Sequence, residues 1–349
     1  MMDKTFDFDY LFGASLSDIK QMDTSLLRGK VEKTNTRTFF GGWYWQPGLL
    51  GKLFKGYDRY LLVCETRALS TWVFCILARL LGKSKKIYFW SHGWYGKESS
   101  LEKTIKKFLF RLPKGGIFLY GNYARKLMID EGFNPQKLHT IHNSLDYDRQ
   151  LEIRKELRVL PIYRDHFGND NPNLFFVGRL TEVKKLDLIL LAMAQLRDKG
   201  QCYNMTFIGD GKERESLVAL TKELKLDQKV WFYGACYDEK VLSDLIYNAD
   251  LCVAPGNIGL TAMHTLAYGT PALTHNDFPY QMPEFEAIRE GETGTFFNIG
   301  DVNSLAESIS RWFNDKKGKR EEVRNACMKE IDEQWNPKFQ IKVLKNNLK

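Results

Sequence analysis

The sequence predicts an α/β protein with two Rossmann-like, doubly wound parallel-sheet domains that face a cleft. Short apolar segments alternate with helical patterns along the whole chain, which is typical of parallel sheets covered by helices. The 349 residues exceed what one hydrophobic core usually supports, because domains typically contain about 100–200 residues. Glycine turns follow expected strands in the second half, and such turns are where these domains bind ligands.

Apolar runs and the polar segments between them define the expected elements. The first half has buried strands at residues 60–64, 87–90, 116–120 and 138–141, with helices over residues 68–81 and 124–131 among them. The second half has strands at residues 174–177, 205–208, 230–233, 251–253 and 272–274, again alternating with helices.

A polar loop divides the two halves. Residues 168–172 contain glycine, proline, aspartate and asparagines, which favour a loop between periodic segments. We therefore expect an N-terminal domain over residues 1–168 and a ligand-binding domain over residues 169–330. Residues 331–349 are expected to form a C-terminal helix that crosses back to the first domain.

Positive charge is concentrated in the first 150 residues, which hold 24 Lys/Arg and 14 Asp/Glu, whereas the remainder holds 27 and 29. A basic half suggests an anionic partner such as a lipid surface or a lipid pyrophosphate. Nucleic acid is not expected, because no recognised binding motif accompanies the charge.

The densest basic stretch runs from Ser99 to Leu112. Ser99 and Glu102 have capping-box spacing, so a helix is expected to begin here. Two interpretations stay open: a core-packed helix with a solvated basic face, or an interfacial helix on an anionic membrane. In both, the apolar residues are expected on one face: Leu101, Ile105, Phe108, Leu109 and Leu112.

The expected location is the cytoplasm, with peripheral association at the inner face of the cell membrane. The acidic N-terminal segment lacks the apolar core of a signal peptide. The longest apolar run, residues 68–78, is shorter than the roughly 20 residues that span a bilayer. The six cysteines form no Cys-x-x-Cys pair and no metal-ligand spacing, so no metal site is expected.

Residues 173–297 have the features of an anion-binding apparatus. A strand ends in Gly178 and Arg179, and Lys184 follows five residues after the arginine. The next strand ends in a turn that contains Gly209 and Gly211. A later strand leads through a glycine loop into a helix N-terminus, whose free N–H groups favour phosphate; the loop and first turn include Asn257, Gly259, Leu260 and Thr261. A sugar diphosphate nucleotide is the ligand that this arrangement suggests.

The order of these motifs resembles the C-terminal half of the GT-B glycosyltransferases, most closely family 4 (group 1) of the polysaccharide-biosynthesis type. Gly178-Arg179-Leu180 with Lys184 is similar to the family's Gly-Arg-Leu-x-x-x-Lys, whose cations hold the donor diphosphate. Glu286 with the segment 290–294 is similar to Glu-x-x-x-Asp-Gly-x-x-Gly. The resemblance implies a retaining, metal-independent glycosyltransferase without a cofactor. Its substrates would be a nucleotide-sugar of UDP, GDP or dTDP type and a lipid-linked or oligosaccharide acceptor, and the resemblance implies that residues 1–168 form the acceptor-side domain.

The sequence departs from the family at both members of a glutamate pair spaced eight positions apart. Counting back from the Gly-x-Pro motif places those positions at Gly256 and His264. His264 can still hydrogen-bond the nucleotide ribose, whereas at Gly256 any contact must come from the backbone or from a neighbour such as Asn257. The family's opening strand and glycine loop also have no counterpart, and residues 6–12 resemble its second strand.

The resemblance also assigns His92 a role, because family members commonly have a histidine after this strand, facing the donor sugar. The expected catalytic residues are therefore His92, Arg179 and Lys184. The expected donor-binding residues are Gly178, Gly209, Gly211, Asn257, Gly259, Leu260, Thr261, His264 and Glu286. Two alternatives remain: a catalytically impaired, nucleotide-binding scaffold, and another GT-B enzyme such as a nucleotide-sugar epimerase.

Overall fold

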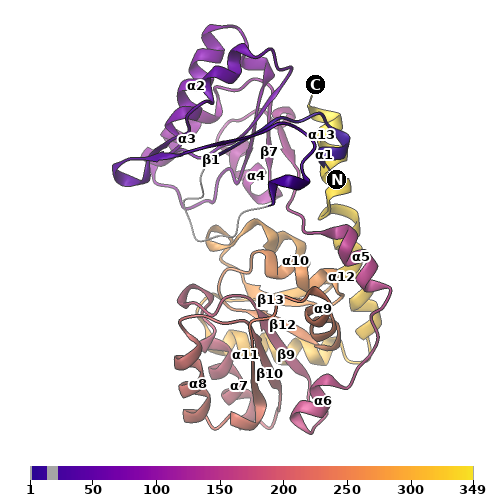
Figure 1. The fold of residues 1–349 in the computed structure, drawn as a ribbon. Coiled ribbons are helices and arrows are strands. Elements are labelled where there is room, and N and C mark those ends of the chain that lie inside the picture. The colour runs from indigo at the N-terminus through magenta and orange to yellow at the C-terminus, as the bar shows by residue number, and fades with distance from the viewer. Residues whose placement is uncertain (1, 14–22, 349) are drawn as a thin grey trace. The chain divides into compact units, whose positions relative to one another are not determined.

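The computed structural model describes residues 2–13 and 23–348 and divides the chain into two compact units. Unit 1 consists of residues 1–141 and 337–349, and unit 2 of residues 142–336. Each unit contains parallel β-sheet and helices (Figure 1), which confirms the predicted α/β class. No helix in the described residues is long and apolar enough to cross a membrane.

Unit 2 is built on a six-stranded parallel sheet with the order β11-β10-β9-β12-β13-β14. This is the doubly wound Rossmann order, in which the chain starts in the middle and reverses direction across the sheet. The strands are β9 (Asn173–Val177), β10 (Asn204–Ile208), β11 (Val230–Gly234), β12 (Leu251–Ala254), β13 (Ala272–His275) and β14 (Gly294–Phe297). The five strands expected for this half are present, and β14 adds a sixth.

The strands of unit 2 are nearly continuous apolar runs because helices cover both faces of a parallel sheet. Phe175, Phe207 and Val253 are fully buried in three neighbouring strands. The helices are α5 (Tyr147–Arg154), α6 (Ile162–Phe167), α7 (Asp187–Asp198), α8 (Arg214–Glu223), α9 (Glu239–Asn248), α10 (Leu260–Ala267), α11 (Val302–Asp315) and α12 (Arg320–Gln334).

Unit 1 has a four-stranded parallel sheet in sequential order, β5-β6-β7-β8. Both faces are covered, since Phe89 packs into one apolar cluster and its neighbour Tyr88 into another. A parallel pair, β1 (Tyr10–Gly13) with β2 (Val31–Thr34), and an antiparallel pair, β3 (Arg37–Thr38) with β4 (Tyr44–Trp45), precede the sheet. The remaining elements are α1 (Met2–Thr5), β5 (Tyr60–Val63), α2 (Leu69–Leu80), β6 (Ile87–Ser91), α3 (Ser100–Phe110), β7 (Gly116–Leu119), α4 (Asn122–Asp130), β8 (Leu138–Thr140) and α13 (Pro337–Asn347).

The final helix, α13, belongs to unit 1. Leu344 is fully buried in the same cluster as Tyr88 and Phe118, so α13 covers one face of the four-stranded sheet. Met2 and Phe6 pack against the same cluster. Both ends of the described chain therefore complete this apolar face.

The division between the units lies at residues 141 and 142, not at the expected residue 168. Residues 142–168 form α5 and α6, and both pack within unit 2. The Tyr163 hydroxyl donates to the Leu245 carbonyl at 2.7 Å, and the Leu160 amide donates to Asn248 Oδ1 at 2.8 Å. The polar loop 168–172 is a turn inside unit 2, because apolar contacts of the preceding helices anchor that segment there.

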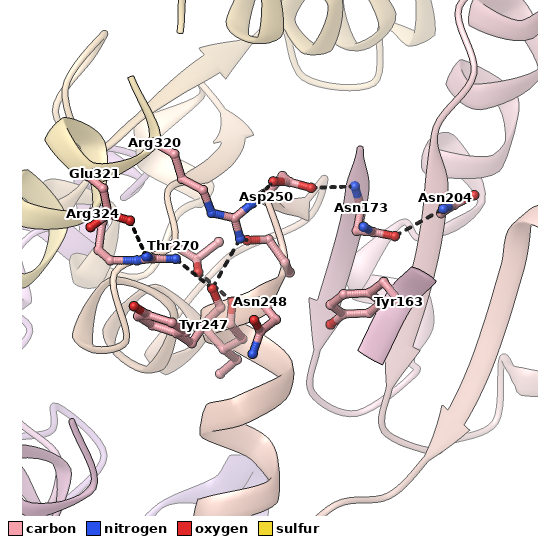
Figure 2. Close-up of polar contacts among 12 residues, drawn as sticks. Tyr163, Asn173, Asn204, Tyr247, Asn248, Asp250, Thr270, Arg320, Glu321 and Arg324 are labelled. Carbon is pink, nitrogen blue, oxygen red and sulfur yellow. Dashed lines mark hydrogen bonds and ion pairs between the residues drawn. The ribbon is translucent and has the colours of Figure 1, made fainter. Parts of the chain in front are cut away.

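Helix α12 is fastened to the amino ends of the unit 2 strands, as Figure 2 shows. Arg320 pairs with Asp250, which also accepts the Asn173 amide at 2.8 Å. Arg324 Nη2 donates to the Tyr247 carbonyl oxygen at 2.9 Å, and the Arg324 guanidinium carbon lies 3.6 Å from the centre of the Tyr247 ring. Because Asn173 begins β9 and Asp250 immediately precedes β12, these contacts lock the helix to the edge opposite the glycine loops.

Candidate functional site

The candidate site lies at the topological switch point of unit 2. Strands β9 and β12 are neighbours in the sheet, and the chain winds away from them in opposite directions. A crevice outside the carboxyl ends of such strands is the general ligand position in open α/β sheets. Gly178 immediately follows β9, and the loop from Pro255 follows β12.

Glycines allow the loops at this edge to approach closely. A Cβ on Gly209 would lie 1.9 Å from the Gly178 carbonyl oxygen, and one on Gly211 would lie 2.2 Å from the Leu180 carbonyl oxygen. Gly178 and Gly209 also adopt φ values of 146° and 150°, which favour glycine. These three residues, expected to bind the donor, thus bring the loops after β9 and β10 together.

Lys184 points at the loop that leads into α10. Its Nζ donates to the Asn257 carbonyl oxygen at 2.7 Å and to Asn257 Oδ1 at 2.8 Å. Burial lowers the pKa of Lys184, the nearby positive charge of Arg179 lowers it further, and Glu284 opposes both effects. Arg179 is exposed, and no ion pair involves it within the described part of the chain. The two cations therefore lie near each other, and the Arg179 guanidinium is available to an anion.

The amino end of α10 adds backbone dipoles to the same place. Gly259 caps this eight-residue helix with a φ of 54° and supplies no side-chain hydrogen bond to the first turn. The Thr261 hydroxyl donates to the Val177 carbonyl at 2.9 Å, which fixes the first turn beside β9. The amides at Leu260 and Thr261 thus belong to an uncapped helix terminus, where anions are stabilised.

The structure consequently gathers most of the sequence-predicted site residues of unit 2 at one sheet edge. Two cations, an uncapped helix terminus and closely approaching glycine loops have the chemistry of a phosphate or diphosphate site. The residues involved are Gly178, Arg179, Lys184, Gly209, Gly211, Asn257, Gly259, Leu260 and Thr261.

Gly256 is a position where a side chain does not fit. A Cβ there would lie 2.1 Å from the Val183 carbonyl oxygen and 2.7 Å from the Lys184 Cα, and both are backbone atoms. The Gly256 amide donates to the Lys184 carbonyl at 2.9 Å. The β9–α7 loop therefore packs directly on residue 256, and the absence of the family glutamate is coupled to the placement of Lys184.

His264 lies on α10, one turn beyond the helix terminus, beside a carboxylate that sequence reasoning missed. Its Nδ1 is 3.6 Å from Glu239 Oε1, and the Tyr268 hydroxyl donates to the same oxygen at 2.6 Å. His264 and the Tyr268 hydrogen bond lower the pKa of Glu239, against the effect of burial. Glu239 is the first residue of α9, and no motif links it to His264 in the sequence.

A second missed carboxylate is Glu284, two positions before the expected Glu286. Glu284 is 2% exposed, and its Oε1 accepts from Asn143 Nδ2 at 2.8 Å. Its Oε2 is buried and has no hydrogen-bond partner among the described residues. Burial raises its pKa, while Asn143 and the Lys184 charge act in the opposite direction. Both glutamates lie in one 3₁₀ turn, η9 (Pro283–Ala287), so spacing alone did not reveal which faces inward. Glu286 is half-buried.

His92 belongs to unit 1 and directly follows β6. Its ring lies 4.7 Å from the Tyr120 ring and 5.9 Å from the Tyr95 ring. Burial lowers the pKa of His92, Glu65 opposes this shift, and Lys106 adds to it. Its Nδ1 is buried, and no residue in the described part of the chain hydrogen-bonds to it. The imidazole is therefore mainly neutral at the carboxyl edge of the sheet, and its Nδ1 can donate or accept a further hydrogen bond.

A cavity of about 550 Å³ lies away from this site, at the amino ends of the unit 2 strands. Its lining includes Asn173, Asp250, Trp312 and Arg320. Asp250 and Arg320 pair with each other and attach α12 to the sheet. We therefore assign the candidate site to the switch point.

A Rossmann sheet with cations and an uncapped helix terminus at its switch point defines an α/β domain of the kind that binds phosphorylated ligands. Residues 163–330 match the family described as glycosyl transferases group 1. EpsD of Bacillus subtilis, a glycosyltransferase by name, is 26% identical over 185 residues, which cover 52% of this chain and 46% of that protein. A Mycobacterium tuberculosis GDP-mannose-dependent phosphatidylinositol dimannoside mannosyltransferase is 34% identical over 103 residues, covering 29% and 26% of the two chains.

Solved structures share the two-domain GT-B fold. HepE of Anabaena, crystallised with UDP, superposes with a TM-score of 0.68 at 15% identity, covering 91% of this chain and 86% of that one. The lipopolysaccharide outer core galactosyltransferase WaaB gives a TM-score of 0.67 at 16% identity, covering 95% and 87%. By contrast, the sequence matches to the first two curated relatives span about half of each relative's length, 46% and 50%.

Proposed function

We propose that this chain transfers a sugar from a nucleotide-sugar donor to a saccharide acceptor, with retention of the anomeric configuration. The observation that carries the proposal is the convergence of Arg179, Lys184 and the α10 terminus at the switch point. The donor's diphosphate occupies this edge, and its ribose lies beside His264 and Glu239. The match of residues 163–330 to the group 1 family supports the same assignment.

The reaction follows from where charge develops. The bond between the sugar C1 and the diphosphate oxygen breaks, which leaves negative charge on the diphosphate and positive character on C1. Arg179, Lys184 and the amides of Leu260 and Thr261 stabilise the negative charge, and fixed dipoles of this kind cost no reorganisation. The acceptor oxygen bonds to C1 on the face that the leaving group departs from, and its proton passes to the departing phosphate oxygen. Because protein groups neutralise the diphosphate, the proposed reaction requires no metal ion or cofactor.

Retention without a protein nucleophile is consistent with Gly256, which has no side chain to attack C1. We assign His92 the role of hydrogen-bonding a hydroxyl of the donor sugar. A neutral imidazole suits this task, and burial of His92 lowers its pKa in that direction.

For the acceptor we propose a lipid-linked saccharide in cell-surface polysaccharide assembly, at the cytoplasmic face of the membrane. The names of similar proteins support this choice: one is a phosphatidylinositol dimannoside mannosyltransferase, and another is a lipopolysaccharide outer core galactosyltransferase. The excess of Lys/Arg in the first 150 residues also suits an acceptor that carries phosphate.

A nucleotide-binding module without turnover is the second candidate. The replacement of both family glutamates, at Gly256 and His264, specifically favours it. The diphosphate site does not depend on those glutamates, so such a module would retain nucleotide affinity.

The decisive experiment is a titration of the full chain with UDP, GDP and dTDP, followed by a donor screen with mass detection of released or transferred sugar. Sugar release or transfer from one donor class supports the enzyme. Tight nucleotide binding with no turnover on any lipid acceptor would favour the binding module. Arg179→Ala is the matched variant, because the side chain is exposed and makes no ion pair with the residues that the structure describes. Equal nucleotide affinity in wild type and Arg179→Ala would reject the proposed diphosphate position.

A further inference from the structure

Helix α2 is apolar on the side that faces away from the core. Phe74, Cys75 and Ala78 are fully buried, as expected for the inner face. On the opposite face, Ile76 is 40% exposed and Leu80 is 78% exposed. A surface helix normally presents polar residues outward, and within residues 2–13 and 23–348 these two side chains stay exposed on an apolar outer face.

Helix α3 extends the same apolar surface. The Phe108 ring stacks on Trp72 of α2 with centroids 5.9 Å apart and an interplanar angle of 16°, and the two helices lie side by side in Figure 1. Leu101 is 71% exposed and Phe108 is 59% exposed. The capping box at Ser99 is present as predicted. However, Leu101 and Phe108 do not share the buried side with Leu109, because α3 contacts the core through Leu109 and Phe110.

These residues form one continuous feature, which we call the α2–α3 strip. On α2 they are spaced four residues apart and on α3 seven apart, and both spacings keep side chains on one face of a helix. Contiguous exposed apolar patches, unlike single exposed residues, mark interaction sites. The strip consists of Trp72, Ile76, Leu80, Leu101 and Phe108.

The segment that carries the strip has an excess of positive charge. Residues 69–112 contain nine Lys/Arg and two glutamates. Arg79 and Arg111 are exposed beside the apolar positions, whereas Lys103 and Lys107 share the single carboxylate of Glu131. The surface therefore combines apolar side chains with a net positive rim.

We propose that the α2–α3 strip docks unit 1 on a lipid bilayer that contains anionic lipids, with the apolar side chains in the headgroup–acyl boundary and the cations among the headgroups. Apolar and Lys/Arg residues in this combination are typical of interfacial helices. Protein interfaces, in contrast, are depleted in lysine. The proposal goes beyond sugar transfer and does not depend on it.

The test is co-sedimentation of the full chain with phosphatidylcholine vesicles, with and without added phosphatidylglycerol, in the absence of nucleotide. We expect binding to the anionic vesicles. Each Lys/Arg near an anionic surface contributes about fivefold in affinity, so Arg79→Gln is expected to weaken binding about fivefold. The double variant Leu80→Ser/Leu101→Ser is expected to weaken it by at least about tenfold, since it removes two apolar side chains from the buried area.

Val159→Ser is the matched control, because Val159 is 79% exposed but lies in unit 2. It should bind vesicles like the wild type, and all variants should keep the wild-type thermal transition. Equal binding to neutral and anionic vesicles, or full binding by the double variant, would overturn the proposal. Self-association that the double variant abolishes, without vesicle binding, would instead make the strip a protein interface. Nucleotide titration of the same samples separates this outcome from failure of the proposed transferase function.

Discussion

Gly256 provides the sharpest test of how the loops at the switch point fit together. In Gly256→Ala, the added Cβ meets the Val183 carbonyl oxygen at 2.1 Å and the Lys184 Cα at 2.7 Å. Neither atom belongs to a flexible side chain, so the β9–α7 loop must move away. The loop that moves is the one that aims Lys184 at Asn257.

The size of the effect follows from overpacking. Forcing an extra methyl into a packed position typically costs about 1–3 kcal/mol, and two backbone overlaps place this site at the upper end. For a unit of this size, about 3 kcal/mol lowers the Tm by roughly 6–12 °C. Displacement of Lys184 should also weaken nucleoside diphosphate binding.

Thermal unfolding and nucleotide titration measure the two consequences on one sample. Gly51→Ala is the control, because no atom of the described residues lies within 4 Å of its added Cβ and its φ lies outside the left-handed range. We expect Gly51→Ala to be neutral or slightly stabilising, by up to about 1 kcal/mol. A Gly256→Ala protein with wild-type Tm and wild-type nucleotide affinity would show that residue 256 does not pack on the Lys184 loop.

Three further predictions concern charged and polar residues of unit 2. Lys184→Met should weaken diphosphate binding and slow turnover, with a loss of about 3–4 kcal/mol of transition-state stabilisation. The control Lys185→Met changes a side chain that is 53% exposed and should have neither effect. Equal effects of the two substitutions would contradict the placement of Lys184. His264→Ala and Glu239→Gln should each weaken nucleoside diphosphate binding but not inorganic diphosphate binding, and unchanged affinity would show that the ribose is held elsewhere. Because burial raises the pKa of Glu284, its folded-state carboxyl favours the proton, so the stability it contributes is present below the unfolded pKa of about 4.3 and is lost as pH rises through the folded value. Glu284→Gln should therefore gain stability relative to the wild type as pH rises through that window, as measured by denaturant unfolding; a constant difference would mean that Glu284 does not titrate there.

Much of the fold could be predicted from the sequence because strand and helix patterns are local. The nine expected parallel strands of the two sheets are all present, since each is a short apolar run bounded by glycine or polar residues. The capping box at Ser99 also follows from spacing alone. The motif glycines and cations of unit 2 were predictable for the same reason: each directly follows a strand, and the carboxyl ends of parallel strands share one edge.

Other features depend on contacts between distant segments. The unit boundary lies at residue 141 because Tyr163 and Leu160 bond to α9, and no local pattern encodes that attachment. Helical periodicity placed Leu101 and Phe108 on the apolar side of α3, but which part of that side meets the core depends on the neighbouring helix. Glu239 is far in sequence from His264, and Glu284 is far from Asn143. Glu284 also lies in a 3₁₀ turn, where residue spacing does not show which side chain points inward.

The sequence by itself determined the α/β class, the position of most strands, and the placement of Arg179, Lys184 and the helix that begins at Leu260 after strands that share one sheet edge. Tertiary structure decided that Gly256 must lack a side chain, that carboxylates reach His264 and Asn143 from other elements, and that the outer faces of α2 and α3 join in one apolar strip. The physical reason is range: backbone pattern and turn chemistry act over a few residues, whereas burial and side-chain pairing depend on which segments the folded chain brings into contact.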